Sequence, residues 1–102
     1  MLEIRPNCEL CDRDLQPDST QARICSYECT FCVDCVESIL KNVCPNCGGG
    51  FSPRPIRPAT AHREGVSLNQ QPASAVRKHS RLNSETIQAF VNQVKNIPPE
   101  AR

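Results

Sequence analysis

The residues of this sequence with the greatest chemical capacity are its eight cysteines, which fall into four close pairs. In three pairs two residues separate the cysteines, and in the fourth pair three residues do. A Cys-x2-Cys segment, called a knuckle below, can direct two thiolates at one tetrahedral Zn²⁺. Eight thiolates complete two four-coordinate sites and leave no position open for water. The sequence therefore predicts two Zn²⁺ ions with a structural role.

A disulfide framework is the main alternative use of so many cysteines. The first seven residues lack the basic start and apolar stretch of a secretory signal, and no apolar run is long enough to cross a membrane. Thiols stay free to bind metal in a reducing compartment. A single iron–sulfur cluster would use only four of the cysteines. We therefore expect a cytoplasmic zinc protein with no membrane association.

Spacing alone leaves open how the cysteines divide between the two metals. Sequential pairing would place Cys8, Cys11, Cys25 and Cys29 on one ion. Interleaved pairing would place Cys8, Cys11, Cys32 and Cys35 in site one, and Cys25, Cys29, Cys44 and Cys47 in site two. The two schemes differ in which distant segments the fold must bring together.

The order of the ligands resembles that of the RING finger family. Its third and fourth ligands lie close together, and its last knuckle reads Cys-Pro-x-Cys, as Cys44-Pro45-Asn46-Cys47 does here. Cys29 stands where most RING domains have His, so this is an all-cysteine variant. The resemblance covers residues 8–47 and implies the interleaved, cross-braced pairing.

Two stretches, residues 2–15 and 24–35, also resemble a narrower bacterial family of short RING-like zinc proteins of unknown function. This second resemblance covers about the first half of the chain. It implies the same fold and a bacterial cytoplasm, and it implies no activity.

Few apolar residues are available to position these ligands, since aromatic residues make up only 4% of the chain. Val36, Ile39, Leu40 and Val43 have helical spacing, which predicts one short helix between the last two knuckles. Five further residues are candidates for a thin core: Leu10, Leu15, Ile24, Phe31 and Phe51. The predicted fold is a small metal-stabilised α+β module over residues 1–50, a RING-like cross-brace with two pairs of zinc knuckles.

The second half of the chain has a different composition. Residues 51–83 are rich in Pro and Arg and predict a flexible linker. Residues 84–97 predict an amphipathic helix with Ser84 as its cap, because apolar residues recur on one face: Ile87, Phe90, Val91, Val94 and Ile97. Residues 98–102 predict a disordered end after Pro98-Pro99. The helix is short and needs a partner surface, which is the module, a second copy in a homodimer, or another protein.

The predicted function is a zinc-binding protein interaction or adaptor module without intrinsic catalysis. No catalytic constellation remains once the cysteines bind zinc, and His62 and His79 are expected to be solvated. The alternative, implied by the RING resemblance, is a ubiquitin ligase that docks a conjugating enzyme through Leu10, Ile39 and Pro45. The RING helix position is commonly aromatic, which weakens the match at Ile39.

Nucleic-acid binding is a further alternative, because the second half of the chain is basic. Six residues provide this charge: Arg54, Arg57, Arg63, Arg77, Lys78 and Arg81. The first half is acidic and would repel phosphate, although the whole chain carries a formal net charge of only +1. No aromatic residues alternate with the basic ones to stack on bases. The sequence therefore favours a protein partner over nucleic acid.

Overall fold

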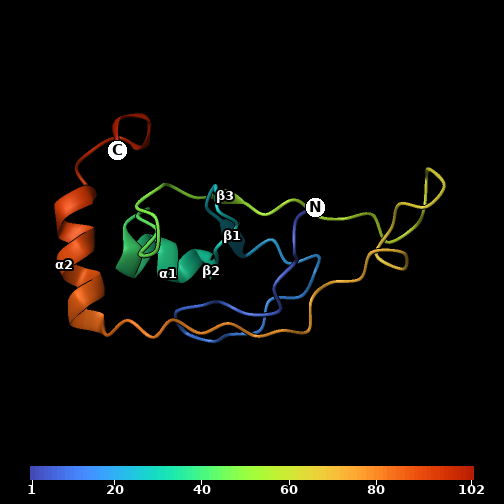
Figure 1. The fold of residues 1–102 in the computed structure, drawn as a ribbon, viewed down its shortest axis with the longest axis horizontal. Coiled ribbons are helices and arrows are strands. Elements are labelled where there is room, and N and C mark those ends of the chain that lie inside the picture. The colour runs from blue at the N-terminus through green and yellow to red at the C-terminus, as the bar shows by residue number, and fades with distance from the viewer.

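Short antiparallel strands lie at the centre of the structure. The computed structural model describes residues 1–102, and its strands are β1 (Ala22–Ile24), β2 (Thr30–Cys32) and β3 (Ser52–Pro53). They form one sheet in the order β2-β1-β3, with both pairings antiparallel (Figure 1). The β1–β2 hairpin places Cys25 and Cys29 at its turn.

One helical segment follows β2 directly. The α-helix α1 (Val33–Cys35) runs without a break into the π-helix η1 (Val36–Leu40). The segment ends where Lys41 and Asn42 adopt left-handed backbone conformations, with φ of 49° and 61°. This is the helix predicted between the last two knuckles.

The apolar face of this helix differs from the predicted one at a single position. Val36, Leu40 and Val43 are buried, whereas Ile39 is 44% exposed. The wider turn of a π-helix brings residues four and five apart onto one face, so that a residue three positions on rotates outward. Ile39 therefore points toward solvent instead of contributing to the core.

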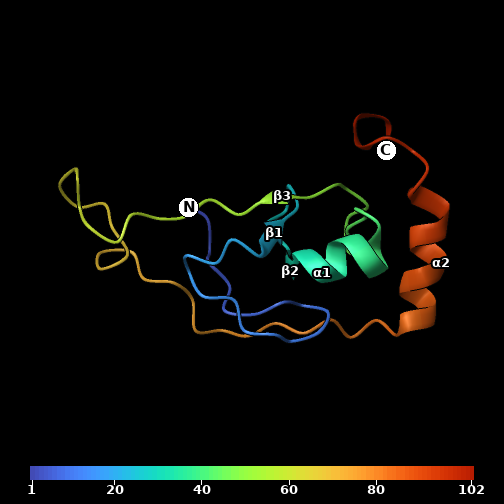
Figure 2. The same ribbon diagram turned by 180° about the vertical axis from the view of Figure 1, so that it is seen from behind.

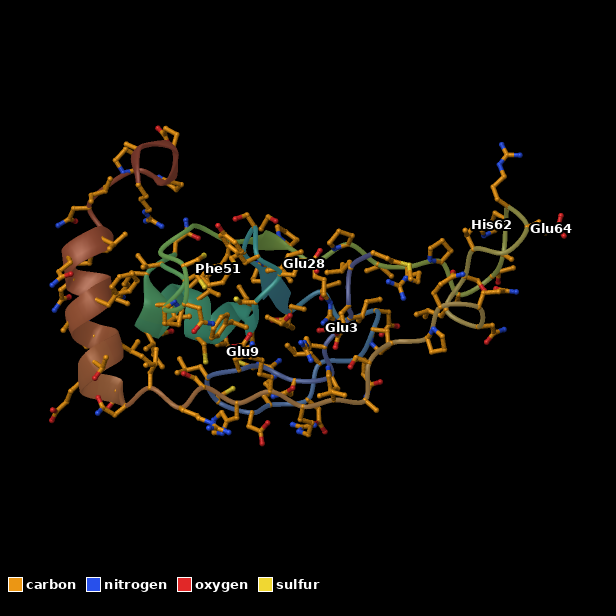
Figure 3. The ribbon with its side chains drawn as sticks, in the orientation of Figure 1. Glu3, Glu9, Glu28, Phe51, His62 and Glu64 are labelled. Atoms are coloured by element: carbon orange, nitrogen blue, oxygen red, sulfur yellow. The ribbon has the colours of Figure 1, made fainter.

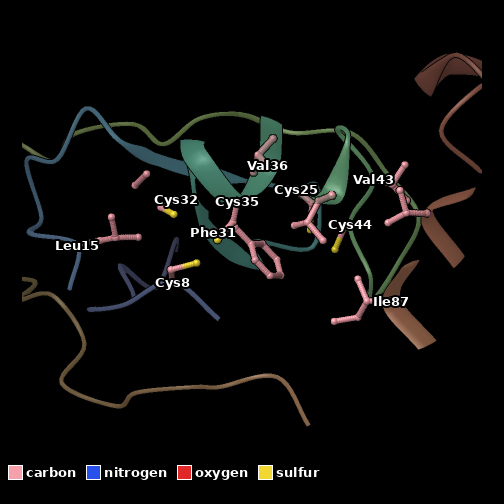
Figure 4. Packing of buried hydrophobic residues seen from close by; sticks show 13 residues of the cluster. Cys8, Leu15, Cys25, Phe31, Cys32, Cys35, Val36, Val43, Cys44 and Ile87 are labelled. Carbon is pink, nitrogen blue, oxygen red and sulfur yellow. The ribbon is translucent and has the colours of Figure 1, made fainter. Parts of the chain in front are cut away.

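The core consists of a few apolar side chains packed among cysteines (Figure 4). Phe31 is fully buried, and its ring meets Phe51 edge-on with 5.4 Å between the ring centroids. Leu15 is buried as predicted, and Leu10 packs against the cluster while remaining partly exposed. Ile4 is also buried, although its isolated position near the N-terminus gave no periodic signal.

The C-terminal helix α2 (Ser84–Val94) ends three residues before the predicted end of the helix. Its cap is Asn83 and not Ser84, because the Asn83 Oδ1 atom accepts a 2.8 Å hydrogen bond from the Thr86 backbone N–H. A short 3-10 helix, η2 (Pro99–Ala101), follows where a disordered end was predicted.

The module itself covers part of the apolar stripe of α2. Ile87 and Val91 are buried in the same cluster as Leu40, Val43 and Cys44. Figures 1 and 2 both show α2 at one end of the molecule, beside the helical segment that carries η1. The core therefore includes a helix that lies more than 30 residues beyond the predicted end of the module.

Residues 73–83 run back along the N-terminal part of the chain. The Ser74 N–H donates to the Ile4 carbonyl (2.9 Å), and the Ser80 N–H donates to the Glu9 carbonyl (2.7 Å). The Asn7 side chain both donates to and accepts from the backbone of Lys78, at 2.9 Å and 3.3 Å. These bonds lie within the range predicted as a linker.

Charged side chains also cross the boundary predicted after residue 50. Arg77 pairs with Asp12 at 3.0 Å and with Asp14 at 2.6 Å. The Arg54 guanidinium, on a residue 4% exposed, donates to the carbonyls of Arg5 and Gln16, both at 2.8 Å. Two basic residues of the tail thus bind the module, Arg77 through opposite charge and Arg54 through hydrogen bonds to backbone carbonyls.

A loop projects from the end of the molecule opposite α2 (Figures 1 and 2). The molecule extends over 46 × 27 × 18 Å, and its radius of gyration is 14.6 Å, above the value of about 13 Å expected for a compact chain of this length. His62 and Glu64 lie at the tip of the loop (Figure 3). No helix in the structure combines the length and the apolar character that a membrane span requires.

Replacing Val91 by Ala will test whether α2 belongs to the core. Val91 is fully buried, so the smaller side chain leaves a cavity and lowers the free energy of unfolding by about 2 kcal/mol. Val76→Ala is the matched control, because Val76 is 63% exposed, and its effect should stay within about 0.5 kcal/mol. Urea denaturation of the zinc-loaded chains measures both. Equal unfolding free energies for the two variants would exclude a core role for α2.

Candidate metal centre

Four cysteine sulfur atoms gather at the first candidate site. The Sγ atoms of Cys8, Cys11, Cys32 and Cys35 all lie within 4.8 Å of one another. The Sγ atoms of Cys11 and Cys32 are 3.8 Å apart. Zn–S bonds of about 2.3 Å in a tetrahedron place the sulfurs about 3.8 Å apart. The donor set and its spacing therefore fit Zn²⁺.

Two local structures deliver these four ligands. In the first knuckle the Asp12 N–H donates to the Cys8 carbonyl (2.9 Å), and Asp12 adopts a left-handed conformation with φ of 64°. This tight turn brings the two sulfurs of the knuckle to one side. Cys32 ends β2 and Cys35 ends α1, so one helical turn places their side chains on the same face.

The second candidate site forms on the other side of the core. The Sγ atoms of Cys25, Cys44 and Cys47 lie within 4.8 Å of one another. Cys29 is not among these three but adjoins them, since the Cys25 N–H donates to the Cys29 carbonyl at 3.2 Å. In the view of Figure 4 the Phe31 ring lies between Cys8, Cys32 and Cys35 on one side and Cys25 and Cys44 on the other.

Backbone geometry shapes the last knuckle. The Gly48 N–H donates to the Cys44 carbonyl (2.7 Å), and the Gly49 N–H donates to the Cys47 sulfur (3.4 Å). Gly48 has a φ of +81°, and a Cβ atom there would lie 3.4 Å from the Phe90 ring. The left-handed conformation therefore favours glycine at this turn, whereas a Cβ atom would meet the Phe90 ring at an ordinary contact distance.

The chemistry of the thiols depends on their burial. Burial raises the pKa of the Cys8, Cys35 and Cys44 thiols above the ordinary value. Without a metal these buried thiols hold their protons at neutral pH. A metal ion must displace the protons to bind, so zinc supplies the charge that makes buried thiolates stable.

The structure thus brings together seven of the eight predicted ligands in two groups, with Cys29 beside the second, and these groups are positioned to bind two zinc ions. Each group includes one exposed cysteine, which is Cys11 in the first and Cys47 in the second. All eight cysteines are free, with no disulfide between any of them.

The other residues singled out in the sequence lie in different environments. Leu10 is half-buried, Pro45 is buried, and Ile39 is exposed, so the three do not present one open face. His79 contacts the Leu10 carbonyl at 3.0 Å through its Nε2 atom. Neither His79 nor His62 belongs to a cysteine group.

Two polar residues beside the sites were not predicted. Glu9 lies inside the first knuckle and is only 3% exposed. The sequence does not predict this burial, because a glutamate in a turn is expected at the surface. Asn46 lies inside the last knuckle, and its Nδ2 atom donates to Glu9 Oε1 at 3.2 Å. Only the three-dimensional pairing of the two knuckles reveals this contact.

Comparison with known proteins gives two matches. A family described as "Protein of unknown function (DUF1272)" matches residues 1–57. The uncharacterised protein R02474 of Rhizobium meliloti (strain 1021) is 54% identical over 77 residues, which cover 76% of this chain and 84% of that protein. No solved structure matches. The family match contains all eight cysteines and extends through β3, past the boundary predicted after residue 50.

Proposed function

We propose that this chain, which belongs to the family of proteins of unknown function DUF1272, is a zinc-stabilised protein interaction or adaptor module without intrinsic catalysis. The observation that carries the proposal is the gathering of cysteine sulfurs into two groups around a thin core. A zinc ion with four thiolate ligands has no position for water or substrate. Its contribution is to hold a surface in shape.

We propose a RING-like cross-brace as the architecture of this module. The first sulfur group combines the knuckle at residues 8–11 with the pair at residues 32–35, and the second group combines Cys25 with the knuckle at residues 44–47. Ligands of the two groups therefore alternate along the chain. This alternation supports the interleaved pairing over the sequential one.

A groove beside the second site is the surface best suited to a protein partner. It has a volume of about 300 Å³ and lies between the turn of the β1–β2 hairpin, the last knuckle and α2. Tyr27 is 78% exposed at its edge, and Ile97 is 40% exposed. Phe90 and Val94 line it from α2. Exposed aromatic and apolar side chains around one groove are typical of protein interfaces.

Capture of binding partners by the zinc-loaded chain tests this role. The double variant Tyr27→Ala/Ile97→Ser should lose a captured protein, because interface anchors contribute about 2 kcal/mol or more to binding. The control Ile56→Ser/Val66→Ala changes apolar residues that are also exposed, at 53% and 50%, but lie outside the groove, and it should retain the partner. A homodimer through residues 84–97 would appear as a doubled mass in sedimentation. No zinc-dependent binding, or equal loss in both variants, would contradict the proposal.

We place the ubiquitin ligase alternative second. Docking of a conjugating enzyme would need Leu10, Ile39 and Pro45 on one open surface. Pro45 is buried, and Leu10 packs against the core. Only Ile39 of the three is exposed, which does not favour the docking surface that the alternative requires.

Nucleic-acid binding is also disfavoured by the contacts of the tail. Arg54 and Arg57 donate to backbone carbonyls, and Arg77 pairs with Asp12 and Asp14. Half of the six basic residues that suggested this alternative thus have partners within the chain.

We also propose a cytoplasmic location, because cysteines stay reduced and available to bind zinc only in a reducing environment.

A further inference from the structure

A buried carboxylate lies between the two metal sites. Glu9 is 3% exposed, and it takes part in none of the ion pairs of the structure. Figure 3 shows it between the N-terminal segment and the helical turn formed by α1 and η1. An ionised carboxylate is costly to bury unless its oxygens accept hydrogen bonds. The hydrogen-bond donors around the Glu9 carboxylate therefore indicate its role.

Both oxygens of this carboxylate accept hydrogen bonds from segments that carry ligands of site two. Oε2 accepts from the Thr30 backbone N–H at 3.1 Å, and Thr30 directly follows Cys29. Oε1 accepts from Asn46 Nδ2 at 3.2 Å, and Asn46 lies between Cys44 and Cys47. Glu9 itself lies between Cys8 and Cys11, which are ligands of site one.

The backbone reinforces one arm of this bridge. The Glu9 N–H donates to the Thr30 carbonyl at 2.9 Å, so the two residues are joined by both backbone and side chain. The other arm ends on Asn46, which lies inside the last knuckle between Cys44 and Cys47. One side chain thus connects the first knuckle to two separate parts of site two.

We propose that Glu9 is a positioning residue that couples the two zinc sites, so that zinc at one site raises the affinity of the other. Zinc in site one fixes the first knuckle and with it the Glu9 carboxylate. The carboxylate then holds Thr30 and Asn46 in the geometry that site two needs, which lowers the cost of ordering the second set of ligands. The coupling is reciprocal by thermodynamic necessity. The inference does not depend on the identity of a protein partner.

Glu9→Gln is the variant that separates this role from simple packing. The two side chains have nearly the same size, but glutamine has one acceptor oxygen and one donor nitrogen. Its donor would face either the Thr30 N–H or the Asn46 amide nitrogen, both of which are donors. The bond from Asn46 Nδ2 is therefore lost in the arrangement seen here while the volume is kept, and Asn46→Ala removes the same arm without leaving an amide that can turn over. Glu37→Gln is the control, since Glu37 is exposed and its substitution removes the same charge from the surface.

Native mass spectrometry during a zinc titration against a chelator measures the coupling directly. Independent sites leave at least half of the molecules with one zinc when half of all sites are filled. For two sites of equal intrinsic affinity, a tenfold coupling, within the usual range for linked sites, reduces the one-zinc form to about a quarter. We expect this low value for the natural chain and for Glu37→Gln, and a rise to half or more for Glu9→Gln.

The opposite results overturn the proposal. A one-zinc form that reaches half or more in the natural chain and does not rise further in the Glu9 and Asn46 variants shows that the bridge carries no coupling. An equally low value in both Glu9→Gln and Asn46→Ala shows that any coupling runs elsewhere. Should Glu9→Gln fail to fold, Asn46→Ala removes only one arm and must show the same rise, and an unchanged value in that variant refutes the bridge. A chain that never binds two zincs refutes the metal sites themselves, which distinguishes that failure from loss of coupling.

Discussion

Removal of zinc by a chelator will unfold residues 1–57, even with every cysteine kept reduced. The apolar core is small, and seven of the eight sulfurs lie in two tight groups inside or beside it. Structural zinc contributes about 10–16 kcal/mol of apparent binding energy per site in zinc-finger peptides. A whole domain has a net stability of only about 5–15 kcal/mol. The binding free energy lost with both ions therefore exceeds the stability that packing of the core can supply.

Backbone amide NMR spectra measure this transition. The zinc-loaded chain should give dispersed signals, the chelated chain should lose them, and added Zn²⁺ should restore them while Mg²⁺ should not. A reducing agent alone should change nothing, because the structure contains no disulfide. Dispersed signals that survive chelation, or that disappear on reduction, would show that zinc does not hold the fold.

Single cysteine substitutions will divide into two classes according to the metal that they disturb. Cys11→Ser and Cys32→Ser should damage one site, since their sulfurs are 3.8 Å apart. Cys29→Ser and Cys47→Ser should damage the other. Each change removes one of four thiolates, so each should cost one bound metal with the second largely retained. Cadmium-113 NMR of the Cd²⁺-loaded chain gives one signal per site and identifies which signal is lost.

The same four variants distinguish the two pairing schemes. Interleaved pairing predicts that Cys11→Ser and Cys32→Ser abolish the same signal. Sequential pairing predicts that Cys11→Ser shares its lost signal with Cys29→Ser instead. Ser26→Ala is a suitable control, because Ser26 is exposed beside Cys25 and is no ligand, and it should leave both signals in place. The second result would overturn the cross-brace.

The cysteine groups could be predicted from the sequence because spacing within a knuckle is a local property. Two thiolates three residues apart are directed at one metal by the turn between them. The division between the sites was not local, and it came from a resemblance to a known family. The helix after Cys35 was also predictable from its apolar spacing, although the wide π-turn that exposes Ile39 was not.

The tail was harder to predict from the sequence. Its composition indicated a linker, since Pro and Arg recur without apolar period. Its contacts are hydrogen bonds to backbone carbonyls and ion pairs, as for Arg54 and Arg77, and such contacts leave no periodic pattern. The position of Glu9 escaped prediction for the same reason. A buried polar residue is recognisable only once the donors around it are known.

The zinc content of the intact chain tests the central claim most directly. Native mass spectrometry of protein purified under reducing conditions gives the number of bound zinc ions, and the denatured mass gives the state of the cysteines. We predict two zinc ions per chain and a denatured mass that corresponds to eight thiols. A chain without zinc whose denatured mass is lower by eight hydrogens, as four disulfides require, would contradict the account.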